Sequence, residues 1–269
     1  MEVYGLIGHP VGHSLSPIMH EAGFRACGID ARYVTFEPAP DAATEAVHAA
    51  ASLGVRGLNV TIPFKQDVLD VVDADERALR VGAVNTIQFG PEPPRGHNTD
   101  VDGILRSFEH FDVPLTGKRA VVVGAGGAGR AAAFALAEAG ADIRIVNRTK
   151  SRADALANEL GEEKGYALDD IPMVLKDASV LVQTTSVGME EDASVIPSDA
   201  LHDQLTVLDA VYAPLETRLL REARAAGATT IDGGWMLLYQ GVAAFELWTG
   251  GSAPVEAMNR ALREALQGN

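Results

Sequence analysis

Residues 119–129 read RAVVVGAGGAG, a β-branched run that leads directly into a glycine-rich turn. The run predicts a buried strand, and the alanine-rich stretch after the turn predicts a helix that continues to Ala139. The turn has the spacing G-x-G-x-x-G, in which glycines allow a tight turn and bring backbone N–H groups close to a pyrophosphate. The strand before it and the helix after it favour this interpretation over an ordinary turn. The predicted dinucleotide site is Gly124, Ala125, Gly126, Gly127, Ala128 and Gly129.

The end of the next predicted strand, residues 142–146, indicates which dinucleotide binds. Proteins that use NAD usually place an acidic residue there, which accepts hydrogen bonds from the ribose hydroxyls. Asn147 takes that place, followed by Arg148, Thr149 and Arg152. Two guanidinium groups can bind a 2′-phosphate, although surface arginines are often only solvated charges. Their grouping in an acidic chain favours NADP as the cofactor.

Strand and helix patterns on both sides of this turn divide the chain into two α/β halves. Toward the C-terminus, further strands alternate with helices and predict a doubly wound, Rossmann-type cofactor domain. Toward the N-terminus, βαβα alternation predicts a mostly parallel sheet, with Asp41 as the cap of its second helix. The later strands are predicted at 180–183, 206–209 and 229–232; the earlier strands at 3–7, 33–37 and 57–62, with helices at 18–26 and 41–53.

The predicted connections set the domain boundaries. A polar turn at 91–98 closes the first half, and a helix at 102–110 leads into the second. After Gly234 the pattern is helical, and we expect this tail to pack back on the first half. The prediction is therefore two domains: residues 1–101 plus 234–269, and residues 102–233.

Composition excludes several classes of function. The net charge of −15 repels a phosphate backbone, so we expect no nucleic-acid partner. The N-terminus has no basic segment before a long apolar run, which predicts no signal peptide and no membrane span, and hence a cytoplasmic protein. Cys27 is the single cysteine, and His9 and His13 have no cluster of acidic residues beside them, so we expect no metal site.

Polar side chains follow the predicted strands of the first half. Hydroxyl, amide and carboxylate groups at strand ends can bind a small polyol, and serines can also bind a carboxylate. Each of them could equally be a turn cap. The residues are Ser14, Ser16, Asn59, Thr61, Asn85 and Asp100.

Together these segments resemble the shikimate dehydrogenase family over nearly the whole chain. The matching segments are SLSP (14–17), NVTIPFK (59–65), GAVNT (82–86), NTDVDG (98–103), NRT (147–149) and WMLLYQ (235–240). The resemblance implies the NADPH-dependent reduction of 3-dehydroshikimate to shikimate, in the chorismate pathway of aromatic amino acid biosynthesis. The implied partner is this small-molecule substrate, bound by a monomer or homodimer.

The resemblance also implies roles for individual residues. Lys65 and Asp100 would be the catalytic pair, because an ammonium can stabilise and protonate the oxygen of a ketone that receives hydride. The serines Ser14 and Ser16 would bind the substrate carboxylate. The ring hydroxyls would be contacted by Asn59, Thr61, Asn85, Asp100 and Gln240, with Tyr212 facing the substrate; Ala210, Gly233 and Glu76 would lie toward the cofactor.

Two alternatives remain open from the sequence. One is a quinate or dual quinate/shikimate dehydrogenase, against which Ser16 and the NADP-type arginines argue. The other is a non-catalytic, cofactor-sensing relative, which loss of Lys65 or Asp100 would have indicated. The departures from the family pattern are Gln183, where Asn is common, Val101, where Gly is common, and Ala210, where a bulkier apolar residue is common.

An excess of carboxylates with few lysines resembles proteins adapted to high salt, and an ordinary acidic soluble protein is the alternative. The chain has 37 acidic residues against 22 Lys and Arg, and mutual repulsion of like charges opposes the folded state unless salt screens it. We therefore expect the melting temperature and the rate of NADP reduction by shikimate to rise with KCl concentration. Full folding and activity at low ionic strength would contradict this adaptation to high salt.

Overall fold

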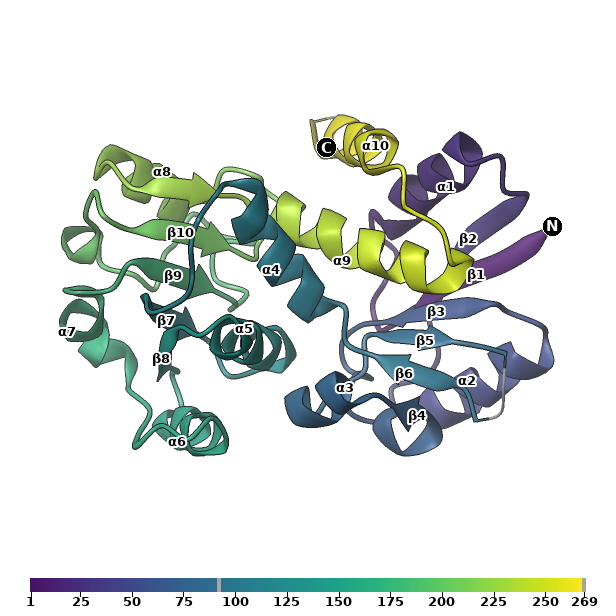
Figure 1. Ribbon diagram of the computed structural model, residues 1–269, viewed down its shortest axis with the longest axis horizontal. Helices are drawn as coiled ribbons and strands as arrows, with labels where there is room; N and C mark the ends of the chain where they lie inside the picture. Colours follow the sequence, from purple (N-terminus) through teal and green to yellow (C-terminus); the bar gives the residue numbers. More distant parts are fainter. Residues whose placement is uncertain (91–92, 268–269) are drawn as a thin grey trace. The chain divides into compact units, whose positions relative to one another are not determined.

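The computed structural model of the chain describes residues 1–90 and 93–267. The backbone divides into two compact units. Unit 1 consists of Met1–Thr99 and Leu238–Asn269, and unit 2 consists of Asp100–Leu237. The long helix α9 (Gly233–Thr249) carries the chain from unit 2 back into unit 1 (Figure 1).

Unit 1 is built on a mixed sheet with the strand order β2-β1-β3-β5-β6-β4. Strand β1 pairs in parallel with β2 and β3, whereas β3, β5 and β6 pair in antiparallel fashion. Its elements are β1 (Glu2–Ile7), α1 (Ser16–Ala26), β2 (Ala31–Phe36), α2 (Ala43–Ser52), β3 (Gly57–Val60), β4 (Asp73–Ala74), α3 (Glu76–Val81), β5 (Thr86–Gln88), β6 (Arg95–His97) and α10 (Val255–Gln267).

Alternation along the strands of unit 1 separates an aliphatic face from an aromatic one. Leu58 and Val60 of β3 join Val47 of α2 in a mostly aliphatic cluster, which also contains Phe64. Residues of opposite parity face α1 and α9, where Tyr4 stacks on Phe24 at 4.9 Å and lies 5.2 Å from Trp248 between ring centroids. The polar residue Asn59 therefore lies on the aromatic side of the sheet.

Unit 2 is a parallel sheet with the strand order β11-β10-β9-β7-β8. Helices connect most of its strands, as expected for a doubly wound sheet. The elements are α4 (Asp100–His110), β7 (Arg119–Val123), α5 (Gly127–Glu138), β8 (Asp142–Val146), α6 (Lys150–Glu159), α7 (Ile171–Leu175), β9 (Val180–Gln183), β10 (Thr206–Asp209), α8 (Arg218–Ala225) and β11 (Thr229–Ile231).

Both faces of the unit 2 sheet are covered. Val121 and Val123 of β7 form one buried cluster with residues of α7 and α8. The alternate positions Ala120 and Val122 are also fully buried, and α5 packs against β7 and β8. A strand that is buried on both faces has a continuous run of apolar residues in its sequence. This explains why the sequence of residues 119–123 predicts a buried strand.

The predicted fold class is confirmed, but two local predictions were wrong. Asp41 does not cap α2, because the helix begins at Ala43 with Ala42 as its N-cap and no side-chain hydrogen bond there. The stretch 91–98 is not simply a polar turn, because β6 runs through Arg95–His97 and pairs with β5; Pro91 and Glu92 lie outside the described residues.

Candidate functional site

The glycine-rich turn after β7 has the geometry that a pyrophosphate requires. Gly124 has a φ of +116°, and a Cβ there would lie 2.4 Å from Thr184 Oγ1. A Cβ on Gly129 would lie 2.2 Å from the carbonyl oxygen of Gly124, so these two glycines hold the turn against the helix. Gly126 is different, because a Cβ there would meet no atom within 4 Å. It is also the N-cap of α5 and makes no side-chain cap, so the N–H groups of the first helical turn receive no hydrogen bond from a capping side chain there.

The predicted phosphate-binding arginines follow the neighbouring strand. Strand β8 pairs in parallel with β7, so Asn147 and the glycine turn lie at the same edge of the sheet. The Asn147 side chain donates to the carbonyl oxygen of Thr149 at 2.9 Å and fixes the turn into α6. Arg148 and Arg152, which follow Asn147 in the chain, are both exposed. These residues and this turn fit a dinucleotide with a 2′-phosphate.

The carboxyl end of β10 brings together three further predicted residues. A Cβ on Gly233 would lie 2.6 Å from the carbonyl oxygens of Ala210 and Val211, so α9 begins directly against this loop. Tyr212 follows in the same loop, and burial raises the pKa of its hydroxyl. Ala210, Tyr212 and Gly233 thus form one corner of unit 2.

A buried carboxylate that sequence reasoning missed organises this corner. Asp209 accepts hydrogen bonds from Thr217 Oγ1 at 2.6 Å, from the backbone N–H of Val211 at 3.1 Å and from Gln183 Nε2 at 3.2 Å. Burial raises the pKa of Asp209 to about 6, although these hydrogen bonds lower it. Its position at the end of a predicted strand, directly before Ala210, was the available signal.

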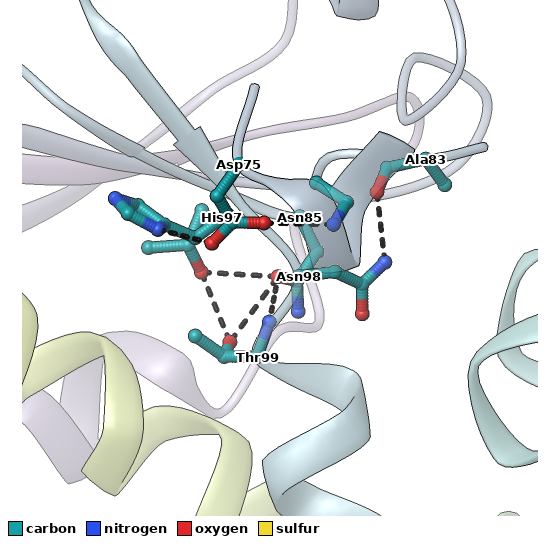
Figure 2. A network of polar contacts seen from close by, with 8 residues as sticks. Asp75, Ala83, Asn85, His97, Asn98 and Thr99 are labelled. Carbon is teal, nitrogen blue, oxygen red and sulfur yellow. Dashed lines mark hydrogen bonds and ion pairs between the residues drawn. The ribbon is translucent and has the colours of Figure 1, made fainter. Parts of the chain in front are cut away.

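In unit 1, a network of buried side chains surrounds Asn85 (Figure 2). Asn85 Oδ1 accepts from the backbone N–H of Thr99 at 2.7 Å and from Thr86 Oγ1 at 3.1 Å. The backbone N–H of Asn85 donates to the carbonyl oxygen of His97 at 3.0 Å. Asn98 donates to the carbonyl oxygen of Ala83 at 2.8 Å. The segment after β6 is therefore held against the start of β5.

This network also anchors the backbone around the predicted catalytic residues. The carbonyl oxygen of Lys65 accepts from the N–H of Val84, the residue before Asn85, at 2.8 Å. Thr99, whose N–H binds Asn85, is followed directly by Asp100, a carboxylate that is 5% exposed. Two adjacent residues, Val84 and Asn85, thus fix the backbone at Lys65 and immediately before Asp100.

The other predicted substrate residues of unit 1 follow β1 and β3 or lie on α9. The N–H of Thr61 donates to the carbonyl oxygen of Ile7 at 2.9 Å, which places Thr61 beside the end of β1. Ser14 accepts from the N–H of Ser16 at 3.3 Å, so it does cap a turn, but its hydroxyl still has its own hydrogen to donate. Gln240 is buried on α9.

Glu76, predicted toward the cofactor, is exposed in the first turn of α3. Its neighbour Asp75 has the more defined role, because it caps α3 by accepting from Ala78 N at 2.7 Å and pairs with His97 Nδ1 at 2.7 Å. Burial raises the pKa of Asp75, but the bonds to His97 and Ala78 outweigh it and leave the pKa below its usual value. Asp75 therefore joins α3 to β6.

Clusters of metal-binding side chains and membrane-spanning helices are both absent from residues 1–90 and 93–267. Within these ranges no group of three or more His, Cys, Asp or Glu residues is arranged to hold a metal ion. The same ranges contain no helix that combines the length and apolarity needed to cross a bilayer.

Comparisons with known proteins cover both units. Three family models match: the shikimate dehydrogenase substrate-binding domain over residues 6–87, shikimate/quinate 5-dehydrogenase over 107–200, and the shikimate 5′-dehydrogenase C-terminal domain over 233–263. The NADP(+) shikimate dehydrogenase of Halorubrum lacusprofundi is 64% identical over 99% of this chain and 100% of its own. That of Natronomonas pharaonis is 65% identical over 99% of this chain and 100% of its own.

A solved structure is also similar. The shikimate 5-dehydrogenase of Thermus thermophilus, in complex with NADP(H) and shikimate, is 40% identical with a TM-score of 0.92. The match covers 99% of this chain and 100% of that one.

Because Gly126 has room for a methyl group, an alanine substitution there can test whether this turn binds the pyrophosphate. In Gly126→Ala, the added methyl should occupy the space through which the phosphates approach the turn. It should not disturb the fold, because the φ of −87° at this position is allowed for alanine. We expect the Kd for NADP, measured by calorimetry, to rise at least about tenfold with an unchanged melting temperature. Gly251→Ala, another glycine with room for a methyl, is the control. Unchanged NADP affinity in Gly126→Ala would remove this turn from the site.

The buried side chain of His20 predicts how the stability of the protein changes with pH. His20 is fully buried on α1, and burial lowers its pKa to about 3. The unfolded chain binds a proton at His20 below about pH 6.5 while the folded chain does not, so stability must fall as the pH falls through this window. Between pH 7 and pH 5 we expect a loss of about 2 kcal/mol from this group.

The measurement is urea unfolding at both pH values. His20→Phe should lack this part of the pH dependence, whereas His48→Phe, at an exposed position of α2, controls for loss of a histidine and gain of a ring. An identical pH dependence in wild type and His20→Phe would show that His20 is protonated in the folded state.

Proposed function

Because this chain belongs to the shikimate dehydrogenase family, we propose that Lys65 and Asp100 carry out its catalytic proton transfer. The protein is an oxidoreductase that interconverts 3-dehydroshikimate and shikimate and uses NADP. Bound NADPH supplies the hydride that reduces the ketone. The protein must supply the proton and must neutralise the charge that develops on the ketone oxygen.

Lys65 is proposed as the group that donates this proton. As hydride adds to the carbonyl carbon, the oxygen gains negative charge, which the ammonium stabilises and then protonates to give the alcohol. In the reverse direction, the neutral amine accepts the hydroxyl proton as hydride leaves the carbon. Lys65 is half-buried, and the bond from Val84 to its carbonyl oxygen fixes the backbone from which the side chain extends.

Asp100 is proposed to orient the amine and to accept a hydrogen bond from the substrate. Its carboxylate is nearly excluded from water at the start of α4. The observation that carries the proposal is the Asn85-centred network, because it fixes the backbone at Lys65 and directly before Asp100.

The remaining polar residues of unit 1 are proposed to bind the substrate. Ser14 and Ser16 would donate hydroxyl hydrogens to the carboxylate, and Thr61, Asn59, Asn85 and Gln240 would contact the ring hydroxyls. The Oδ1 atom of Asn85 accepts from Thr99 and Thr86, so these two residues fix the orientation of the amide.

Unit 2 is proposed as the NADP-binding unit. The turn at 124–129 would bind the pyrophosphate, and Asn147, Arg148, Thr149 and Arg152 would bind the adenosine end with its 2′-phosphate. Ala210 and Gly233 would line the nicotinamide, and Tyr212 would face the substrate. Glu76 of α3 is proposed toward the cofactor as well.

The test is Lys65→Ala with Lys118→Ala as its control. Lys118 is exposed directly before β7, at the edge of the sheet opposite to the glycine turn. Loss of the proton donor should lower kcat for NADP reduction by shikimate about 10²- to 10⁴-fold, with only a modest change in KM, while the control stays near wild type. A near-normal kcat in Lys65→Ala would refute the assignment.

A further inference from the structure

Tyr33 has a buried hydroxyl that binds a proposed substrate residue. It lies on β2, is 3% exposed, and donates to Asn59 Oδ1 at 2.7 Å. Tyr33 pairs with Tyr4 of β1, and Asn59 pairs with Leu6 of β1, so the phenol reaches across one whole strand to make this bond. A hydrogen bond buried this deeply is costly to lose, because water cannot readily replace the donor.

The amide of Asn59 is committed to one orientation. Its NH₂ group donates to Thr86 Oγ1 at 3.0 Å and to the carbonyl oxygen of Asn85 at 3.3 Å. Both amide hydrogens are therefore used, and Oδ1 keeps one lone pair beyond the bond from Tyr33. A flipped amide would place its oxygen against the Asn85 carbonyl oxygen, where two acceptors repel each other. Asn59 can therefore bind a ligand only through Oδ1, as a hydrogen-bond acceptor.

The bond from Tyr33 begins a chain of polar contacts that ends beside the catalytic pair. Asn59 donates to Thr86 Oγ1, which donates to Asn85 Oδ1 at 3.1 Å. Asn85 Oδ1 also accepts from the N–H of Thr99 at 2.7 Å, one residue before Asp100. The chain runs from β2 through β3 and β5, and each bond constrains the next.

We propose that Tyr33 is a positioning residue for the substrate: by donating to Asn59 Oδ1 it fixes the direction of the acceptor that receives a ring hydroxyl. The inference rests on the proposed function, in which Asn59 binds the substrate. It adds a residue that touches neither substrate nor cofactor and acts through Asn59.

The surroundings of Tyr33 hold its ring in place. The ring of His20 stacks on it with centroids 4.6 Å apart and an interplanar angle of 3°. Trp248 of α9 lies against both rings, at 5.3 Å from His20 and 6.3 Å from Tyr33. The Ser16 side chain also lies beside the phenol. Rigid packing on two sides keeps the hydroxyl aimed at Asn59 and Ser16, both proposed to bind substrate.

A purely structural role for Tyr33 makes a different prediction. If the phenol only stabilised the core, its removal would lower the melting temperature and leave the kinetic constants of the folded enzyme unchanged. Tyr4 supplies the matched control, because it is the direct partner of Tyr33 on β1 and belongs to the same aromatic cluster. Its hydroxyl donates to Glu2 Oε2 at 3.2 Å, and Glu2 is not one of the proposed site residues.

The experiment compares the steady-state kinetics of Tyr33→Phe and Tyr4→Phe with wild type. We expect Tyr33→Phe to raise KM for shikimate about tenfold while KM for NADP stays within about twofold. Tyr4→Phe should leave both constants within about twofold. A KM for shikimate in Tyr33→Phe within twofold of wild type, or an equal change in Tyr4→Phe, would overturn the proposal.

A crystal structure of the wild-type protein with shikimate covers the case in which Tyr33→Phe does not fold. The expected result is Asn59 Oδ1 accepting from both Tyr33 and a ring hydroxyl; a flipped amide, or an Asn59 with no contact to shikimate, overturns the proposal. A wild-type enzyme that fails to reduce NADP with shikimate would instead refute the proposed function, whatever Tyr33 does.

Discussion

The site in unit 1 depends on one constraint: a buried amide must have its donors and acceptors matched. Asn59 and Asn85 are 4% and 2% exposed, so an amide hydrogen without an acceptor, or an amide oxygen without any donor, would be costly because water cannot readily replace the missing partner. Matching both amides at once requires Tyr33, Thr86 and Thr99 at their observed positions. The backbone of Asn85 and Thr99 is therefore held in place by satisfying these hydrogen bonds.

In unit 2, the proposed pyrophosphate site depends on backbone N–H groups and not on side chains. The turn after β7 keeps side chains out, and its shape is fixed by close contacts at Gly124 and Gly129. Asp209 does the equivalent at β10, where one carboxylate joins the loop at Val211, the N-cap of α8 at Thr217, and Gln183 at the end of β9. Each unit thus positions its loops with a small number of buried contacts.

Sequence reasoning found the elements whose patterns are local. Strand β7 is buried on both faces and reads as an uninterrupted apolar run, and the glycines after it have a fixed spacing. Strand β6, by contrast, has the sequence Arg95-Gly96-His97, which carries no apolar pattern because it is formed by pairing with β5. The bond from Tyr33 to Asn59, the pairing of Asp75 with His97 and the bonds of Asp209 to Thr217 and Gln183 were missed for the same reason: these partners are distant in the chain, and only folding brings them together.

Gln183 shows how a departure from the family pattern can be accommodated by the same kind of matching. Its Nε2 donates to the carbonyl oxygens of Thr185 and Val187, both at 3.2 Å, and to Asp209, while its Oε1 accepts from the N–H of Thr185. The side chain therefore closes the turn after β9 on itself and also ties that turn to β10. An Asn is one methylene shorter and could not span both partners from the same backbone position. Gln183 therefore joins the two loops through one side chain. Through its bond to Asp209, it helps to hold the loop that contains Ala210 and Tyr212.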